Sequence, residues 1–466
     1  MAEALALPVP RALLRLALPI LASQALRLAY QWVDALWVRG LGVEATAAIT
    51  TSVFVLWWVY ALNDVFCVGA SAFVSQLLGA GDRARAGVTT AKLIAASTAL
   101  GLLVSAFAPL LARPIFMLLD PSGLVVDEGA AYLRIAMLAA PLPMVAMAFD
   151  TVMRAAGDTR TPLLLDLGAV LLNAVLAPFF IYGWGPFPRL GVEGAAWSTA
   201  IAHASLVLNF AALAWRRHPA VPLARRAPGP PVRLLALARV GVPAALIGIL
   251  FSVVYIVLAR AASPYGAAAV AVVGIVNRIE AVQFIIALSL GLAAATLVGQ
   301  SLGAGRPERA REAIRLAQRW IVGLSLALTL CFLALPQAFF AMFTQDPEVF
   351  RLGVPYLRVM ALGLVAVGIE VVTAEAIVGS GHTQVISWIY TAFSLVRIPL
   401  AFLVPTWWGL GVQGLAWLIT ITCILRMVMI YAWAARGHWQ SGLTRELAHV
   451  PGSSPPAVTP GGSPPV

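Results

Sequence analysis

The sequence predicts an all-α membrane protein with twelve transmembrane helices, arranged as two pseudo-symmetric six-helix bundles around a central cavity. Hydrophobic residues make up 61% of the 466 residues, charged residues only 11%, and the mean hydropathy is +0.90. So few charges cannot cover a water-facing surface, so lipid is the expected solvent. The apolar runs are long and contain Gly and Pro, which favours helices over the short alternating strands of a membrane barrel.

Charged or Pro/Gly-rich breaks divide the chain into apolar runs long enough to be spans, which require roughly 20 residues each. The six runs of the first half begin near Ala12, Ala45, Thr90, Ala130, Pro162 and Val192. The six runs of the second half begin near Leu234, Ala267, Trp320, Val354, Val385 and Val412. The first run has no small-residue cleavage site after a short core, so we expect a retained span rather than a removable signal peptide.

An internal repeat indicates that the two halves are related. The segment VSQLLGAGD at 74–82 recurs as VGQSLGAGR at 298–306, and AGDT at 156–159 recurs as SGHT at 380–383. Six spans are an even number, so both halves have the same orientation and form a parallel repeat about an axis along the membrane normal. Such a repeat predicts a cavity between the halves near the midplane, and transport by rocking of one half against the other.

The repeat also defines the expected domain organisation. We expect a first bundle over 1–214, a cytoplasmic linker over 215–233, a second bundle over 234–436, and a cytoplasmic tail over 437–466. The tail is rich in Pro, Gly and Ser from about 451 onward, and has nothing to bury, so this part is expected to be disordered.

The net charge of +11 reflects topology rather than nucleic-acid binding. Arginines cluster on the even-numbered connections, whereas the odd-numbered connections carry only scattered ones. This asymmetry is the positive-inside pattern, and it predicts cytoplasmic even loops and cytoplasmic termini in a prokaryotic inner membrane. The clusters are Arg83/Arg85, Arg154/Arg160, Arg216/Arg217/Arg225/Arg226/Arg233 and Arg306/Arg309/Arg311/Arg315/Arg319.

The repeated GAGD and GAGR segments resemble phosphate-binding loops only superficially, because they lack the Lys and Ser/Thr of a nucleotide loop. We expect each to form a tight cytoplasmic turn, the second followed by an amphipathic stretch, RPERAREAIRLAQRW, on the membrane surface. No other segment is typical of an ATP-binding domain, so an ion gradient is the expected energy source. The three cysteines, Cys67, Cys331 and Cys423, have no metal-ligand spacing and are interpreted as small core residues.

Acids inside the apolar runs are the candidate functional residues. An ionised Asp near a helix centre costs about 2.5–3.5 kcal/mol, so such a group faces a cavity or a partner. A desolvated carboxylate can hold a proton or a cation and release it when its surroundings change, as an antiporter requires. Asp34 lies in the first run with Gln31 one turn earlier, and Arg27 a further turn back is a possible partner. The alternative is that Asp34 is an acid at the helix end, near Arg39.

Further acids are secondary candidates. Asp64 and Glu280 lie within the second and eighth runs, and Glu370 and Glu375 within the tenth, where Arg397 of the next run is a possible counter-charge for them. The remaining two, Asp150 and Asp166, lie close to cytoplasmic ends, where solvation is easier. For these secondary acids we favour a structural or gating role.

The order and spacing of these motifs resemble the multidrug and toxic compound extrusion (MATE) family. The resemblance rests on the duplicated Gln-x-x-Gly-Ala-Gly turn, on GDTRTP at 157–162, and on LGVEGAAW at 190–197 with its repeat LGVQGLAW at 410–417. It covers about residues 13–429 and implies a secondary antiporter for multidrug (xenobiotic) efflux. WVDALWVRGLG at 32–42, with its single acid, resembles the DinF-like branch of the family.

The DinF-like resemblance implies an ion-coupling site in the first bundle. In that branch the site consists of the acid of the first span, an Asn, an acid one turn after the Asn, and a Thr. The corresponding residues in this sequence are Asp34, Asn173, Ala177 and Thr199. Ala177 departs from the pattern. A sodium ion needs several oxygen ligands whereas a proton needs one basic oxygen, so we favour proton over sodium coupling. Asp166, two turns before Asn173, is a possible substitute for the lost acid.

The resemblance further implies that a charged Asp34 holds an amphipathic, cationic small molecule, and that protonation of Asp34 after rocking expels it. Aromatic side chains could line the cavity and provide cation–π contacts, or could anchor helices at the interface. The residues considered for the cavity are Gln31, Tyr30, Trp32, Trp57, Trp58 and Trp197.

Two other classes remain open. A flippase for lipid-linked or polysaccharide precursors would favour arginines in the cavity, such as Arg27 and Arg397, and a channel would need no coupling acid. An enzyme is not expected, because no nucleophile–base pair or metal cluster is visible and the five histidines lie far apart. We expect no cofactor, no metal, no nucleic acid, a lipid bilayer as surroundings, and a monomer.

Overall fold

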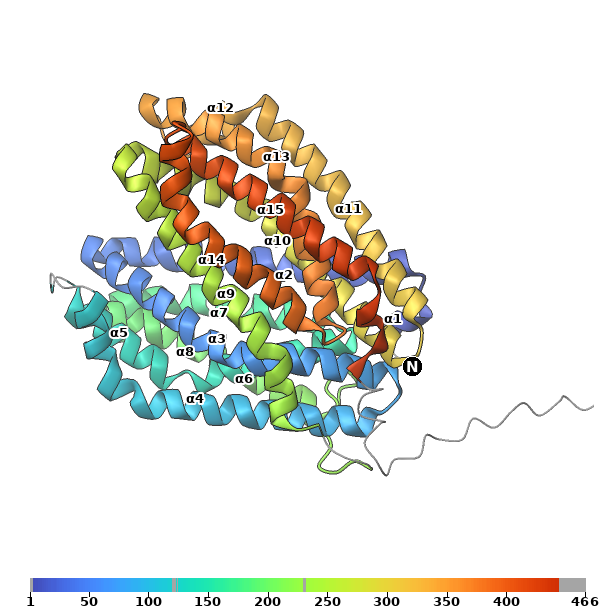
Figure 1. Ribbon diagram of the computed structural model, residues 1–466. Coiled ribbons are helices and arrows are strands. Elements are labelled where there is room, and N and C mark those ends of the chain that lie inside the picture. The colour runs from blue at the N-terminus through green and yellow to red at the C-terminus, as the bar shows by residue number, and fades with distance from the viewer. Residues whose placement is uncertain (1–2, 120–122, 124, 229–231, 444–466) are drawn as a thin grey trace, which may run out of the picture.

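The structure is a computed structural model that describes residues 3–119, 123, 125–228 and 232–443. Over this part of the chain the regular elements are helices (Figure 1). Those of the first half are α1 (Glu3–Ala6), α2 (Val9–Val38), α3 (Val43–Gly79), α4 (Arg83–Leu119), α5 (Val126–Leu138), α6 (Pro141–Ala156), α7 (Arg160–Tyr182) and α8 (Val192–Trp215). Those of the second half are α9 (Leu234–Ala262), α10 (Ala267–Gly303), α11 (Pro307–Ala334), α12 (Pro336–Ala341), α13 (Pro347–Val378), α14 (Thr383–Trp407) and α15 (Val412–Ala435). Short 3-10 helices occupy Arg39–Leu41, Ser263–Tyr265 and His438–Ser441.

The predicted number of spans is confirmed, with one span broken. Within the described residues, 11 helices are long and apolar enough to cross a membrane, and the bent pair α5 and α6 raises the number to 12. The pair bends by 50° at Ala139 and Ala140, and Pro141 opens α6. Proline suits the first turn of a helix but cannot continue a preceding one, which accounts for the break.

The two halves repeat each other in structure as well as in sequence. Helices α3 and α10 both contain 37 residues, and each begins directly after a glycine with positive φ, Gly42 at 111° and Gly266 at 96°. Each ends at the predicted tight turn, where Gly81 and Gly305 adopt φ of 79° and 69°. Only glycine adopts such backbone angles readily, so the duplicated GAG segments have a direct conformational cause. Figure 1 shows the first half, blue to green, below the second half, green to red.

One sequence expectation about the second turn is wrong. RPERAREAIRLAQRW does not form a separate surface stretch before a span beginning near Trp320, because α11 runs without interruption from Pro307 to Ala334. The stretch is amphipathic, but its apolar face is buried: Ala310, Ala313 and Ala317 belong to a hydrophobic cluster with residues of α2, α10 and α13. Packing against these helices stabilises the continuous helix.

Each half packs the beginning of its first helix into the other half. Val9, Leu13 and Ile20 of α2 lie in a hydrophobic cluster with residues of α10, α11 and α13. Reciprocally, Leu237 and Val240 of α9 lie in a cluster with residues of α3, α4 and α6. The exact domain boundaries remain predictions, but this exchange shows how α2 and α9 interlock the two halves.

Two equivalent glutamines join the halves at the end where the glycine turns lie. The Gln76 Nε2 donates to the Gly379 carbonyl at 2.9 Å, and the Gln300 Nε2 donates to the Ala155 carbonyl at 2.9 Å. The repeat that relates 76 to 300 also relates 155 to 379, so the two bonds are pseudo-symmetric. Because both glutamines are fully buried, these bonds fix the contact between the halves.

Candidate substrate cavity and ion-coupling site

A cavity of about 550 Å³ lies inside the first half. Its lining comes from helices α2, α3, α5, α6, α7 and α8, and every lining residue falls between 26 and 206. The sequence predicted a cavity between the halves, and this one instead lies within the first bundle. The apolar window of α3, which contributes to the lining, is 28% buried, against 56% for its counterpart α10.

Aromatic side chains form much of the cavity lining. Phe54, Trp57 and Tyr60 face it from α3, and Tyr132 contributes from α5. Phe54 and Trp57 contact each other edge to face, with ring centroids 5.7 Å apart. Trp197, which the sequence also proposed for the cavity, lies on α8, is 46% exposed and does not belong to this lining.

Two acids and two arginines form the charged part of the site. The Asp150 Oδ2 lies 3.1 Å from the Arg27 Nη2 and 2.9 Å from the Arg154 Nη2. Arg27, Asp150 and Asp166 line the cavity, and the buried Asp166 Oδ2 has no hydrogen-bond partner among the described residues. The expectation that Asp150 is easily solvated is wrong, because its side chain is only 8% exposed. The partner that the structure gives to Arg27 is Asp150.

Asn173 and Thr199 of the predicted ion-coupling site contact Tyr30, which lines the cavity. The Tyr30 hydroxyl donates to the Thr199 Oγ1 at 3.1 Å, and the Asn173 Nδ2 donates both to the Tyr30 hydroxyl and, at 3.3 Å, to the Thr199 Oγ1. Asp34 is four residues beyond Tyr30 on α2. The side chains of Asp34 and Gln31 lie outside the described residues, so their roles remain predictions.

Ala177, the position where the family resemblance led us to expect an acid, lies in an apolar environment. Its side chain is 1% exposed and belongs to a hydrophobic cluster with Val38 and Ile181. An acid there would have to be buried among these side chains. In the described part of the chain, no group of three or more His, Cys, Asp or Glu side chains could hold a metal ion.

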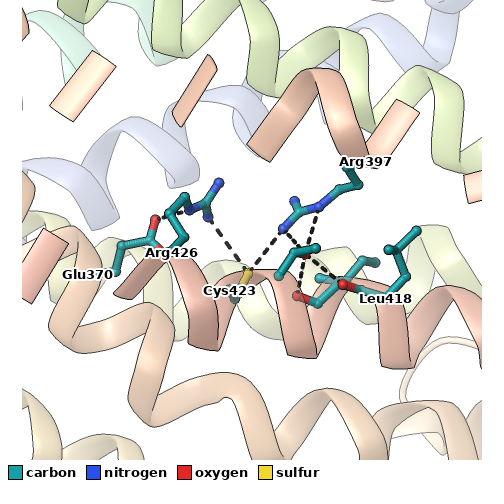
Figure 2. A network of polar contacts seen from close by, with 7 residues as sticks. Glu370, Arg397, Leu418, Cys423 and Arg426 are labelled. Atoms are coloured by element: carbon teal, nitrogen blue, oxygen red, sulfur yellow. Dashed lines mark hydrogen bonds and ion pairs between the residues drawn. The ribbon is translucent and has the colours of Figure 1, made fainter. Parts of the chain in front are cut away.

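The second half contains a separate polar network, shown in Figure 2. Glu370, 1% exposed, pairs with Arg426 at 2.8 Å between Oε1 and Nε. The sequence proposed Arg397 as its counter-charge, but Arg397 instead donates to Thr422. Arg426 was overlooked, although an arginine inside the last apolar run was the available signal. Glu280 is half-buried on α10 and forms no ion pair with a described residue.

Two related halves of membrane-spanning helices with an internal amphipathic cavity define a multi-pass membrane transport protein. The MatE family model matches residues 19–179 and again residues 243–403, one match in each half. The chain therefore belongs to the MatE family, whose members are transporters and not enzymes.

Relatives and solved structures cover nearly the whole chain. The FAD transporter of Shewanella oneidensis is 28% identical over 438 residues, 93% of this chain and 96% of that protein. The probable multidrug resistance protein NorM of Deinococcus radiodurans is 30% identical over 429 residues, 87% of this chain and 90% of that protein. A crystal structure of MATE in the bent conformation superposes with a TM-score of 0.87 at 23% identity, covering 96% and 99% of the two chains.

These comparisons confirm the predicted family, the two-bundle fold and a role as a membrane transporter. They do not specify a branch of the family, so the DinF-like assignment stays a prediction.

Proposed function

We propose that the chain is a cation-coupled antiporter that binds amphipathic, cationic organic molecules in the first-half cavity and exports them, with protons as the coupling ion. The observation that carries the proposal is the cavity, which places an aromatic wall beside Asp150, Asp166 and Arg27. A volume of about 550 Å³ falls within the range of small-molecule sites, roughly 300–1,000 Å³. Aromatic faces and carboxylates together favour organic cations.

Proton coupling is supported by the surroundings of Ala177. Because residue 177 is an alanine, packed in an apolar cluster, α7 supplies no carboxylate at that position, one turn after Asn173. A sodium site would need several oxygen ligands, whereas one carboxylate suffices for a proton. We assign the proton to Asp34, next to the Tyr30, Asn173 and Thr199 cluster, with Asp166 as the second acid to be tested.

The proposed cycle uses the charge of Asp34 as a switch. With the cavity open to the inside, ionised Asp34 contributes to holding the cationic molecule. After the halves rock, a proton from outside neutralises Asp34, which removes the attraction and releases the cargo. Return of the protonated form to the inside, followed by release of the proton there, restores ionised Asp34 and completes the exchange of one cation for another.

We place the protein in a prokaryotic inner membrane as a monomer with both termini in the cytoplasm. The arginine-rich even connections support this orientation. The turn after α3 and the turn after α10 then face the cytoplasm, together with the linker after α8.

A second candidate function is export of an organic anion or zwitterion, including a dinucleotide or a lipid-linked precursor. The similarity to a protein named FAD transporter, over 93% of this chain, favours it. Arg27 also supports it, since its side chain lines the cavity and is 50% exposed.

The test is efflux from proteoliposomes of a cationic dye and of an anionic flavin dinucleotide, with imposed proton or sodium gradients. Asp34→Asn is compared with wild type and with Asp158→Asn, which removes an acid outside the cavity. We expect proton-driven dye efflux that Asp34→Asn abolishes and Asp158→Asn retains. Undiminished efflux by Asp34→Asn would exclude the assigned acid, sodium dependence would exclude proton coupling, and transport of the dinucleotide alone would favour the second candidate.

A further inference from the structure

The polar network of the second half contains more positive than negative charge. Arg397 is 7% exposed and Glu370 is 1% exposed, and the side chain of Arg426 is 11% exposed. Glu370 pairs with Arg426 alone, and among the described residues no carboxylate lies within ion-pair distance of Arg397. A buried arginine without an acid is costly in a membrane protein, so a function is expected for it.

The contacts of Arg397 come from neutral and weak acceptors. Its Nε and Nη2 donate to the Thr422 Oγ1 at 3.0 and 2.5 Å, and its Nη2 lies 3.5 Å from the Cys423 Sγ. Thr422 donates its own hydroxyl hydrogen to the Leu418 carbonyl at 2.6 Å, which orients its oxygen lone pairs toward Arg397. The network therefore holds the guanidinium group in place without neutralising it.

The two guanidinium groups converge on one atom. The Arg426 Nη2 lies 3.7 Å from the same Cys423 Sγ, and Figure 2 shows both side chains turned toward this sulfur. Arg426 is also fixed by Glu370 and by stacking of its Cζ 4.2 Å above the Tyr390 ring. A thiol is a weak acceptor, so two charged donor groups meet where no strong acceptor is described.

We propose that Arg397 and Arg426 form an anion-binding site in the second half, specific for a carboxylate or phosphate group. Such an oxyanion accepts hydrogen bonds from both guanidinium groups, for which planar arginine forks are well suited. It would replace the sulfur as the shared acceptor and neutralise Arg397, while Glu370 continues to neutralise Arg426. The bound group belongs either to a lipid headgroup or to a soluble organic anion, and the two sources share this chemistry.

The expected approach is from α9. Tyr255 on this helix is half-buried, and α9 packs against α14, the helix that carries Arg397. The neighbouring Phe251 ring lies 4.6 Å from the Tyr255 ring and is 49% exposed. An amphiphilic anion could therefore place its apolar part against these two rings and its charged group at the arginines.

The experiment measures binding of phenyl phosphate to the purified full-length protein in phosphatidylcholine nanodiscs, with and without phosphatidylglycerol. Wild type is compared with Arg397→Gln, with the charge-retaining Arg397→Lys, and with the matched control Arg278→Gln on the exposed face of α10. Binding of tetraphenylphosphonium, a cation, is measured in parallel. Under the proposed function this cation binds in the first-half cavity, so its binding tests the proposed function and the folding of each variant independently of the anion site.

We expect Arg397→Gln to weaken phenyl phosphate binding about tenfold or more, while Arg397→Lys retains part of it and Arg278→Gln all of it. Competition by phosphatidylglycerol, lost in Arg397→Gln, would assign the site to lipid headgroups, and its absence would assign it to soluble anions. Equal phenyl phosphate binding by wild type and Arg397→Gln would overturn the proposal. Equal weakening of the cation in Arg397→Gln would also overturn it, since Arg397 would then have only a structural role.

Discussion

The two halves share helix lengths and glycine turns but differ in how fully equivalent helices are buried. Helices α3 and α10 have the same length and the same glycine turns, yet the apolar window of α10 is buried twice as fully, at 56% against 28%. The first half keeps its charges at the wall of a cavity, whereas the second half encloses them between helices. After a duplication, the turns and helix lengths can thus persist while the packing around equivalent helices diverges.

The largest expected difference concerns the two buried acids. Glu370→Gln should destabilise the protein by about 3–5 kcal/mol, because Arg426 is left charged and enclosed. Asp150→Asn should cost clearly less, because the side chain of Arg27 is 50% exposed and water can solvate it. Thermal unfolding in detergent ranks the two variants.

Glu348→Gln is the control for this pair, since its ion pair with Arg351 is exposed and should contribute little to stability. A larger loss of stability for Asp150→Asn than for Glu370→Gln would show that the ion pair of the second half is not the more fully enclosed of the two.

The next largest loss of stability is expected for glycines at the contact between the halves. A Cβ at Gly79 would overlap the Gln300 carbonyl oxygen, and a Cβ at Gly303 would overlap the Gln76 carbonyl oxygen. Each Gly→Ala change should cost about 1–3 kcal/mol and should reduce transport, because the backbones can no longer approach. Gly323→Ala on α11, where nothing lies within 4 Å, is the control and should be neutral or stabilising. Unchanged stability and transport in Gly303→Ala would show that the halves do not meet as described.

Removing an aromatic ring from the cavity should weaken binding without unfolding the protein. Trp57→Ala should lower the affinity for a cationic dye about tenfold, because the ring is part of the lining and is already 53% exposed. Trp388→Ala on α14, 73% exposed in the other half, serves as the matched control. Dye titration of both variants checks this, and an equal loss for both would mean that the dye binds elsewhere.

The smallest expected effect is at the symmetric glutamines. Gln76→Ala and Gln300→Ala should each cost about 1 kcal/mol for the lost bond across the halves. Gln76→Ala should reduce stability somewhat more, because the Gln76 Oε1 also accepts a hydrogen bond from the Leu443 backbone N–H at 2.7 Å. Thermal unfolding of the two variants measures the difference, and a greater loss for Gln300→Ala would contradict it.

Much of the fold could be predicted from the sequence because helix length and the repeat are local signals. The duplicated Gln and glycine positions indicated the two halves and the tight turns. The continuous α11 could not be predicted, because it depends on packing: Ala310 and Ala313 contact neighbouring helices only in the folded structure. The break before Pro141 had a local signal in the proline itself, which the division into apolar runs did not use.

The candidate site was less predictable than the fold. Asn173 and Thr199, which the sequence proposed for one site, are hydrogen-bonded to each other, and both are hydrogen-bonded to Tyr30, which the sequence proposed for the cavity. The pairing of acids with arginines was wrong for Glu370, since spacing along the chain does not determine which helices are neighbours. The position of the cavity depends on how α2, α3 and α5 to α8 pack around it, which apolar composition does not reveal.

An acid in the first half that exchanges a cationic molecule for a proton is central to the proposed transport cycle. The most direct measurement is the affinity of the purified protein for a cationic dye as a function of pH, for wild type, Asp34→Asn and Asp166→Asn. Wild type should bind more weakly as the pH falls, because protonation removes the attracting charge, and Asp34→Asn should bind weakly with no pH dependence. A wild-type pH dependence retained by Asp34→Asn, and lost only in Asp166→Asn, would contradict the assignment of the exchanging acid to Asp34.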